Sequence, residues 1–410
     1  MTVPIPVLVI DSVTNQISKD YPTLQSSSKL KLFQVCCEMW LFILEEHETE
    51  KSKKEKEFGD SKIDNIYANI SREQFQKFQI KLNGKVFQYT QIKNLLIKSN
   101  LIEDNSKYKV GEFSKSYRPN PENKYSTYQL VDLDFKLFLK NENIIENLIL
   151  ENPKHAKLIK DLYLAKINLS TLLTDLQSRL GKPYTTKSNK WNTKSWDVIL
   201  DDKRLMELMI KAIKINLGIH FFKEADTGRI YSSIANLPKL CLPHLTLNGN
   251  AVAEVDAVNC QPLIISSFLN NEQYKQDCEA GIYYEKMAAH FSINRDEFKL
   301  LNLSKILFNN TKIDSKLMSK IDEVYPGLAE EINKYKANSK EEAETMDRKQ
   351  LLWNRLQSIE AAIFIKVAKS LPYPVLTRHD SIIVSSEYKV KIEKALTREF
   401  KKYDLNVKFK

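Results

Sequence analysis

The stretch LTLNGNAVAEVDAVN, residues 245–259, carries the strongest local structure signal in this chain. An Asn248-Gly249 pair stands between two short runs with alternating apolar residues. Asn-Gly between alternating runs is the strongest short-range sequence signal for a β-hairpin. Residues 245–259 therefore predict a hairpin whose second strand ends near Asp256.

A second β-prone stretch is PVLTRHDSIIVSS, residues 374–386. Two short runs flank His379 and Asp380, which we place at the bend between two strands. Helical patterns cover 279–336 and 340–371, and the final residues indicate a helix followed by a last strand. We therefore expect an α+β fold in which a helical insertion separates two carboxylates carried by strands.

The composition is that of an ordinary globular protein. The 410 residues include 62 Lys or Arg and 52 Asp or Glu, for a formal net charge of +10. This length allows two or three domains. The basic character suits a polyanionic partner such as nucleic acid, although surface solubility explains it almost as well. The Gly-rich phosphate-binding motifs GxGxxG and GxxxxGK[ST] do not occur.

The cysteines and the apolar runs bear on location. The five cysteines form no CxxC pair, and the apolar but uncharged start MTVPIPVLVI does not predict a signal peptide. No apolar run approaches the roughly 20 residues that cross a bilayer. We therefore expect reduced thiols, no membrane association and a cytoplasmic location.

The N-terminal third combines helices with a basic hairpin. Apolar residues at spacings of three and four predict a helix at 30–46, and the charged run at 51–60 predicts a solvated linker. A helix at 91–101 is followed by alternating residues around Gly111, which is the outline of a winged helix.

The basic edge of this outline would contact a nucleic-acid backbone. Lys115 and Arg118 are the candidate contacts, supported by Lys107 and Lys109, and Tyr117 would offer a ring for stacking. The alternative is a small structural domain with a solvated basic edge. The following region, about 127–225, is helical in pattern, except that the polar segment 182–197 predicts an exposed loop.

Asp256 and Asp380 can converge in space although they are far apart in the sequence, because neighbouring strands lie about 4.8 Å apart. Two such carboxylates form a hard-oxygen site of the kind that Mg²⁺ prefers, and Mn²⁺ is a possible substitute. Waters or substrate phosphates fill the remaining positions, as in the two-metal sites of phosphoryl transfer. The alternative is that His379 and Asp380 only form a turn.

A cationic helix face lies in the predicted insertion. Arg295 and Lys299 are four residues apart on a predicted helix and point the same way. Cations one turn apart repel each other unless an anion lies between them, and a triphosphate is such an anion. The alternative is a pair of solvated basic residues beside Asp296 and Glu297.

Five motifs of the last part of the chain occur in an order that resembles a known family. They are TGRIYSSIANL at 227–237, VDAVNCQPLI at 255–264, Arg295-x3-Lys299, Gln357-x2-Glu360 and RHDSIIV at 378–384. The set resembles the palm and fingers of family A DNA polymerases, whose relatives include single-subunit phage-type RNA polymerases. The resemblance covers roughly the last 185 residues.

The resemblance implies roles for the acids and the helix cations. Asp256 and Asp380 would bind the catalytic metals, two Mg²⁺ ions. Arg295 and Lys299 would hold the incoming nucleoside triphosphate, and Lys299 would also neutralise the departing pyrophosphate.

The resemblance also implies contacts to nucleic acid. The segment with Thr227 and Arg229 would hold the primer–template duplex. Gln357 resembles a glutamine that contacts the duplex near the primer end. His379 precedes the metal ligand as it does in the family.

Two departures from the family concern the nascent base pair. Family members carry an aromatic residue four positions after the fingers lysine, where this chain has Leu303. They carry Tyr-Gly further on, whereas here Phe308 precedes Asn309. Phe308 is the candidate replacement, with an offset of one residue.

Two further residues bear on the choice of sugar. Five residues after Asp256, DNA polymerases of the family have a bulky Glu that blocks a ribose 2′-OH, and the RNA polymerases have Gly. Gln261 retains bulk at this place, which favours deoxynucleotides. Ser381, by contrast, is more similar to the RNA enzymes.

We therefore expect a right-hand polymerase fold, with an antiparallel palm sheet and helical fingers. Residues 1–125 would form a helical, winged-helix-like accessory domain and 126–225 a thumb-like linking region. Residues 226–410 would form the palm, with fingers at about 279–345.

The expected function is that of a template-directed nucleotidyltransferase. It would be a DNA polymerase that adds dNTPs to a 3′ end by two-metal catalysis, without a proofreading exonuclease. Its partners would be a primer–template of DNA, or of RNA, and nucleoside triphosphates. Alternatives are an RNA-synthesising or template-independent enzyme of the same fold and a catalytically inactive DNA-binding replication protein.

Overall fold

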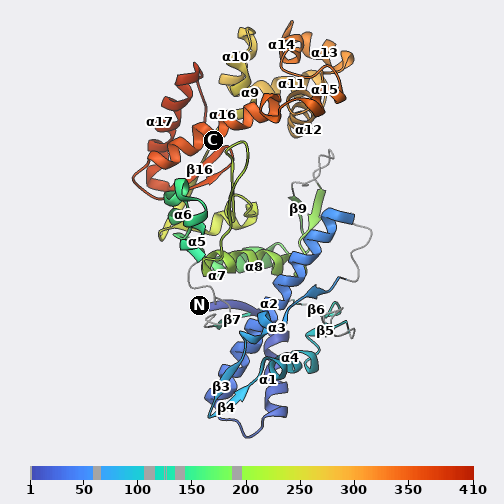
Figure 1. Ribbon diagram of the computed structural model, residues 1–410, viewed down its shortest axis with the longest axis vertical. Helices are drawn as coiled ribbons and strands as arrows, with labels where there is room; N and C mark the ends of the chain where they lie inside the picture. Colours follow the sequence, from blue (N-terminus) through green and yellow to red (C-terminus); the bar gives the residue numbers. More distant parts are fainter. Residues whose placement is uncertain are drawn as a thin grey trace. The chain divides into compact units, whose positions relative to one another are not determined.

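The computed structural model describes residues 2–58, 66–105, 116–123, 125, 127–133, 144–186 and 196–410. The chain divides into two compact units (Figure 1). Unit 1 comprises Met1–Asn143, Ile167–Pro183 and Ile199–Leu217, and unit 2 comprises Ile144–Lys166, Tyr184–Val198 and Gly218–Lys410. The two units thus share the residues 126–225 that were expected to form a separate linking region.

Unit 1 is built around one long helix. Helix α2 (Ser26–Phe58) packs against α1 (Val7–Asp20) and α4 (Tyr89–Lys98). The helix predicted at 30–46 lies within α2 and is confirmed, and its Trp40 is fully buried. The other elements that lie in unit 1 are β1 (Thr2–Pro6), β2 (Ala68–Asn69), α3 (Arg72–Gln76), β3 (Ile80–Leu82), β4 (Lys85–Phe87), β5 (Ile102–Asp104), β6 (Ser116–Pro119), β7 (Tyr128–Asp132), α7 (Leu169–Ser178) and α8 (Asp202–Leu217).

The linker predicted at 51–60 is wrong for its first eight residues, because α2 continues through Phe58. Lys and Glu are good helix formers, and pairs three or four residues apart add a few tenths of a kcal/mol each. Lys53 and Glu50 form such a pair, with their charged groups 3.7 Å apart. A run of charged residues therefore does not by itself end a helix.

The predicted helix at 91–101 is confirmed by α4, and β5 and β6 follow it as antiparallel strands. Residues 106–115, which include Lys107, Lys109 and Lys115, lie outside the described residues. Tyr117 does not present a ring for stacking, because it is buried and packs edge-on against Phe75 at 5.1 Å. Burial of the aromatic face on the core outweighs its use at the surface.

Arg118 is held in an ion pair. Its guanidinium lies 2.9 Å from the Glu103 carboxylate on the neighbouring strand and stacks over the Tyr67 ring at 4.7 Å. The contact of Arg118 with nucleic acid stays a prediction.

Unit 2 contains a five-stranded sheet with the order β15-β16-β14-β13-β8. Its strands are β8 (Ala165–Ile167), β13 (Leu245–Leu247), β14 (Asn250–Asp256), β15 (Val375–Arg378) and β16 (Ser381–Ser385). The hairpin predicted at 245–259 is confirmed by β13 and β14, with Asn248 and Gly249 both at positive φ. The bend predicted at His379 and Asp380 is confirmed as the connection of β15 to β16.

The five-stranded sheet packs against α16 (Leu352–Ser370) and α17 (Lys389–Phe400). In Figure 1, helices α10 to α15 gather beyond one end of α16, away from β16. The described part of the chain is mixed α+β with small antiparallel sheets, as predicted. The helices of this end are α9 (Cys260–Ser266), α10 (Glu272–Glu279), α11 (Tyr283–Phe291), α12 (Arg295–Leu301), the π-helix η4 (Asn302–Leu307), α13 (Ser315–Asp322), α14 (Leu328–Asn333), α15 (Lys340–Thr345) and η5 (Arg348–Gln350).

The remaining elements of the fold are short, and two of them lie where a loop was predicted. The segment 182–197 is not a loop at its ends, because β9 (Pro183–Thr186) and β10 (Trp196–Ile199) pair with each other. β-branched and aromatic residues at these ends favour strands. The other elements are α5 (Ile144–Glu151), η2 (Pro153–His155), α6 (Ala156–Leu162), β11 (Phe222–Glu224), β12 (Ile230–Ser232), η3 (Lys239–His244), η6 (Ser386–Tyr388) and η7 (Lys401–Tyr403).

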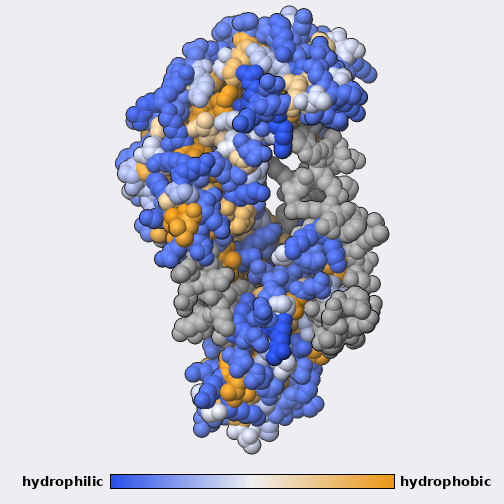
Figure 2. Space-filling model, in the orientation of Figure 1, coloured by the Kyte–Doolittle hydropathy of each residue, from blue (hydrophilic) through white to orange (hydrophobic). Residues whose placement is uncertain are grey.

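The described surface is predominantly polar. On the face shown in Figure 2, hydrophilic residues cover most of it and apolar residues occupy small separate areas. Among the described residues, no helix has the length and apolar character that crossing a membrane requires. The five cysteines are free and buried.

Candidate active site

The two acids singled out in the sequence lie at the same end of neighbouring strands. Asp256 ends β14 and stands opposite Ser381, the first residue of β16. The backbone N–H of Ala257 donates to the carbonyl of Asp380 at 3.3 Å. Burial, followed by the charge of Asp380, raises the pKa of the Asp256 carboxyl. The strand register therefore brings the two carboxylates into each other's electric field.

The donor set fits a hard divalent cation. Carboxylate oxygens are the ligands that Mg²⁺ prefers, and it keeps several positions for waters and substrate phosphates. A positive group already lies at this place, since the Lys410 ammonium is 2.7 Å from Oδ2 of Asp256. Within the described ranges, no group of three or more His, Cys, Asp or Glu side chains is placed to hold a metal ion. Asp256 and Asp380 are thus two candidate ligands, and waters or substrate phosphates would have to fill the remaining positions.

The bend beside Asp380 is fixed by its neighbours. His379 has φ of +54°, and its ring packs edge-on against Tyr231 at 5.5 Å. Ser381 donates from its hydroxyl to Glu254 at 2.5 Å. Arg378 also lies 3.4 Å from this Glu254 carboxylate. These contacts orient both strands that flank Asp380.

The TGR segment forms the turn of a small hairpin that packs on α16. Strands β11 and β12 pair with Glu224 opposite Ile230, so Thr227 and Gly228 lie in the connection. Gly228 has φ of +76°, and a Cβ atom there would lie 3.6 Å from Ala361 of α16. Glycine suits this place because it adopts positive φ without strain.

Arg229 is held by a buried glutamate. Its guanidinium lies 2.5 Å from Oε1 of Glu360, a residue that is 1% exposed. The Gln261 amide donates to the other oxygen of Glu360, and Gln261 is itself buried. Arg229 and Gln261 are therefore joined through one carboxylate, while Thr227 is buried in the hairpin.

The Glu360 carboxylate lies within the electric field of Asp380. Burial raises the pKa of Glu360 to about 7, with Asp380 adding to the rise and Arg229 opposing it. Gln357 lies one turn earlier on α16 and is half-buried. The buried Cys260 thiol has its pKa raised by burial and by the charge of Glu360, so it stays protonated.

This shift has a consequence for stability. Because the pKa of Glu360 rises from its ordinary value of 4.5 to about 7, the folded chain binds this proton more tightly than the unfolded chain. The contribution is fully present below about pH 4.5 and is lost as the pH rises through about 7, by up to about 3 kcal/mol. Glu360→Gln should remove this loss, measured as the free energy of unfolding in urea at pH 5 and pH 8.

The control for this test is Glu387→Gln, which changes an exposed glutamate in the same unit. It should keep the pH dependence of the wild-type chain. If Glu360→Gln also keeps that dependence, the buried carboxyl does not titrate with a raised pKa.

The cations at 295 and 299 lie on one face of α12, as predicted. Asn294 caps this helix and forms a capping box with Glu297. The Arg295 guanidinium lies 5.5 Å and the Lys299 ammonium 5.7 Å from the centre of the Tyr284 ring. Arg295 also pairs with Glu285 at 2.5 Å.

Tyr284 is buried beneath these two cations. Burial raises the pKa of its hydroxyl, the charge of Arg295 lowers it and that of Asp380 raises it. Phe298, also fully buried, fixes α12 against this core.

The helix that carries the cations continues without a break as the π-helix η4. Its first residue, Asn302, is fully buried and accepts a hydrogen bond from the Tyr283 hydroxyl at 2.7 Å. Phe308 follows the π-helix, is half-buried, and donates its backbone N–H to the carbonyl of Leu303. Short π-helices occur frequently at functional sites.

Sequence reasoning missed two residues of this site. Glu360 was quoted in a motif without a role, although it shares a helix face with Leu356 and Phe364 at spacings of four. A lone acid on an apolar helix face is a signal for a buried ion pair. Lys410 gave no such signal, because its contact with Asp256 depends on the tertiary fold. Of the predicted nucleic-acid contacts, Arg118 lies in unit 1 and the others described lie in unit 2.

No protein-family model matches this chain, and a search of curated proteins finds no match.

Proposed function

We propose that this protein is a nucleotidyltransferase that adds dNTPs to a nucleic-acid 3′ end under the direction of a template. The observation that carries the proposal is the pairing of β14 with β16, which sets Asp256 beside Asp380. The cationic face of α12, on which Arg295 and Lys299 both lie over the Tyr284 ring, supports it. The ordered motifs that resemble family A polymerases also support nucleotidyl transfer.

In the proposed reaction, the 3′-hydroxyl of the primer attacks the α-phosphate, and pyrophosphate leaves. Asp256 and Asp380 would hold the divalent cations, which supply charge stabilisation to the attacking and leaving oxygens when bound. Arg295 and Lys299 would bind the triphosphate, where a charge-assisted hydrogen bond is roughly twice as strong as a neutral one. Positioning and electrostatic stabilisation supply most of the rate in phosphoryl transfer.

Primer extension with purified protein, a primer–template, dNTPs and Mg²⁺ tests the proposal. We expect extension that stops when Mg²⁺ is chelated and that follows the template when single dNTPs are supplied. Addition of nucleotides to a primer without a template would instead favour the template-independent alternative. No incorporation under any of these conditions would contradict the proposal.

Two residues bear on whether the substrate is a deoxynucleotide or a ribonucleotide, and the structure shows the contacts of both. Ser381, the hint for RNA, bonds to Glu254 within the sheet, which explains the serine without reference to the sugar. Gln261 is held by Glu360, so its bulk is fixed in place. We therefore favour deoxynucleotides as substrates.

Gln261→Gly tests this preference. Because the substitution removes the side chain that would exclude a 2′-OH, we expect the ratio of dNTP to rNTP incorporation to fall by about 10- to 100-fold. Steady-state kcat/KM for dATP and ATP on one primer–template measures it. The buried neighbour Cys260→Ala is the control and should leave the ratio unchanged, and an unchanged ratio in Gln261→Gly would contradict the gate.

A further inference from the structure

The end of the described chain runs beside the strand that carries Asp256. Phe409 forms an antiparallel bridge with Ala257. The Lys410 backbone N–H donates to the carbonyl of Asp256 at 3.1 Å, and the Val258 N–H donates to the carbonyl of Lys408 at 2.9 Å. Residues 408–410 therefore extend the hydrogen bonding of the segment that follows β14.

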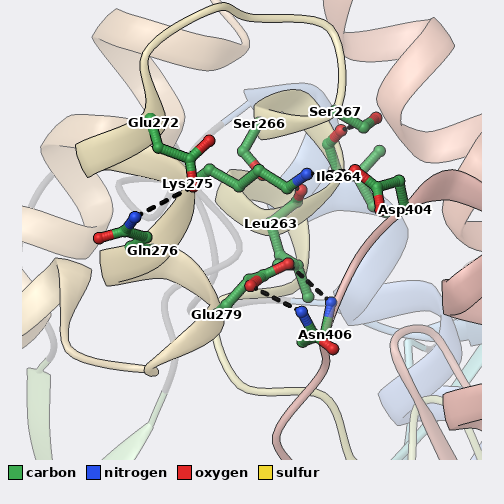
Figure 3. A network of polar contacts seen from close by, with 10 residues as sticks. All are labelled: Leu263, Ile264, Ser266, Ser267, Glu272, Lys275, Gln276, Glu279, Asp404 and Asn406. Atoms are coloured by element: carbon green, nitrogen blue, oxygen red, sulfur yellow. Dashed lines mark hydrogen bonds and ion pairs between the residues drawn. The ribbon is translucent and has the colours of Figure 1, made fainter.

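Polar contacts with α10 hold the preceding residues of this segment (Figure 3). Asn406 donates from its backbone N–H to one carboxylate oxygen of Glu279 at 2.8 Å and from its side-chain amide to the other at 2.9 Å. Lys275 pairs with Asp404 at 2.6 Å. Two hydrogen bonds to one carboxylate fix orientation as well as position.

Apolar packing fixes the same segment. Leu405 is fully buried. A Cβ atom at Gly281 would lie 3.1 Å from Val258 and 3.6 Å from Lys408, so glycine permits a close approach here. The Lys408 ammonium donates to the carbonyl of Ala280 at 2.9 Å. The position of residues 404–409 is thus set by contacts that do not involve the Lys410 side chain.

Residues 404–409 place the positive charge of Lys410 beside Asp256, the candidate metal ligand. The Lys410 ammonium lies 2.7 Å from Oδ2 of Asp256, and its side chain is 60% exposed. Ion pairs with this exposure contribute little to folding. An oxygen that pairs with an ammonium ion is less available to a metal ion, because the two cations repel each other.

We propose that Lys410 is an intramolecular cation that competes with the divalent cation for Asp256 and so raises the metal concentration at which the site fills. This inference rests on the metal site of the proposed function and adds a residue that controls it. Metal binding displaces the ammonium ion from Asp256 toward solvent, which the exposed side chain permits. No covalent step is involved.

Titration of the full chain with Mn²⁺ alone, with free Mn²⁺ followed by electron paramagnetic resonance, tests the proposal without a measurement of activity. We expect Lys410→Met to lower the Mn²⁺ dissociation constant by about three- to tenfold, and Lys410→Arg, which keeps the charge, to remain close to wild type. Lys394→Met, which removes an exposed positive charge on α17, is the matched control and should change the constant little. The melting temperature of Lys410→Met should stay close to that of the wild type.

The outcomes separate this inference from the proposed function. If Asp256→Asn loses Mn²⁺ binding but Lys410→Met binds as the wild type does, or more weakly, the role of Lys410 is overturned and the metal site stands. If Asp256→Asn binds Mn²⁺ as the wild type does, the metal site itself is wrong, and both proposals fall. A lower melting temperature of Lys410→Met with unchanged metal affinity would show a structural role only and would overturn the inference.

Discussion

Replacing Asp256 or Asp380 by asparagine should lower the rate of dNTP incorporation by at least about 10³-fold. Each substitution removes one of two negative charges that would hold the divalent cations, and loss of such charge costs several kcal/mol in the transition state. Asparagine has nearly the same shape, so the β14–β16 pairing should persist. Single-turnover primer extension measures the rate, and circular dichroism checks the fold.

The matched control is Asp11→Asn, which makes the same chemical change at an exposed position of unit 1. It should extend the primer as the wild type does. If Asp256→Asn and Asp380→Asn also retain wild-type rates, these acids are not part of a catalytic site.

Replacing Arg295 or Lys299 by alanine should lower kcat/KM for the incoming dNTP by about 100-fold each. Truncation removes a charge-assisted hydrogen bond to the triphosphate, and such bonds contribute about 1.5 to 3 kcal/mol. Because both cations lie over the Tyr284 ring, the double variant should lose less than the product of the two single losses. Steady-state kinetics with varied dNTP concentration measures the effect.

Lys316→Ala controls for a general loss of positive charge, because this lysine is exposed on α13. It should leave kcat/KM unchanged. An effect of Arg295→Ala that matches Lys316→Ala would assign Arg295 to its ion pair with Glu285 and not to a substrate.

The strands that carry the acids could be predicted from sequence because their signals are local. Asn248-Gly249 sets a two-residue turn, and alternation sets the faces of the strands, so the end of β14 at Asp256 followed directly. The bend between β15 and β16 could be predicted from sequence equally well. The pairing of β14 with β16 required more, since it joins residues far apart in the sequence. The spacing of neighbouring strands allowed the two acids to converge, and the resemblance to a family indicated that they do.

Contacts that depend on several elements escaped prediction. Glu360 binds Arg229, which lies in a small hairpin, and Gln261, which lies in α9. Neither the spacing of these residues nor the composition predicts that they come together. Tyr117 was misassigned because an aromatic residue beside lysines fits a nucleic-acid surface as well as a core. Its burial against Phe75 depends on packing between α3 and β6.

Helix ends were the least predictable local feature. The pattern at 279–336 predicted long helices, whereas the structure divides it into α11, the continuous pair α12 and η4, α13 and α14. Caps such as Asn294 and Asp314 begin new helices within this pattern, because a side-chain oxygen satisfies the free N–H groups of a helix start. The periodicity of apolar residues alone does not show where such a new helix begins.

Anomalous scattering from crystals soaked in Mn²⁺ is the most direct test of the central claim, that Asp256 and Asp380 share a divalent cation. We predict an anomalous peak within about 2.3 Å of a carboxylate oxygen of each residue, absent from crystals of Asp380→Asn. A map without a peak between these carboxylates, at Mn²⁺ concentrations that fill other sites, would contradict the claim.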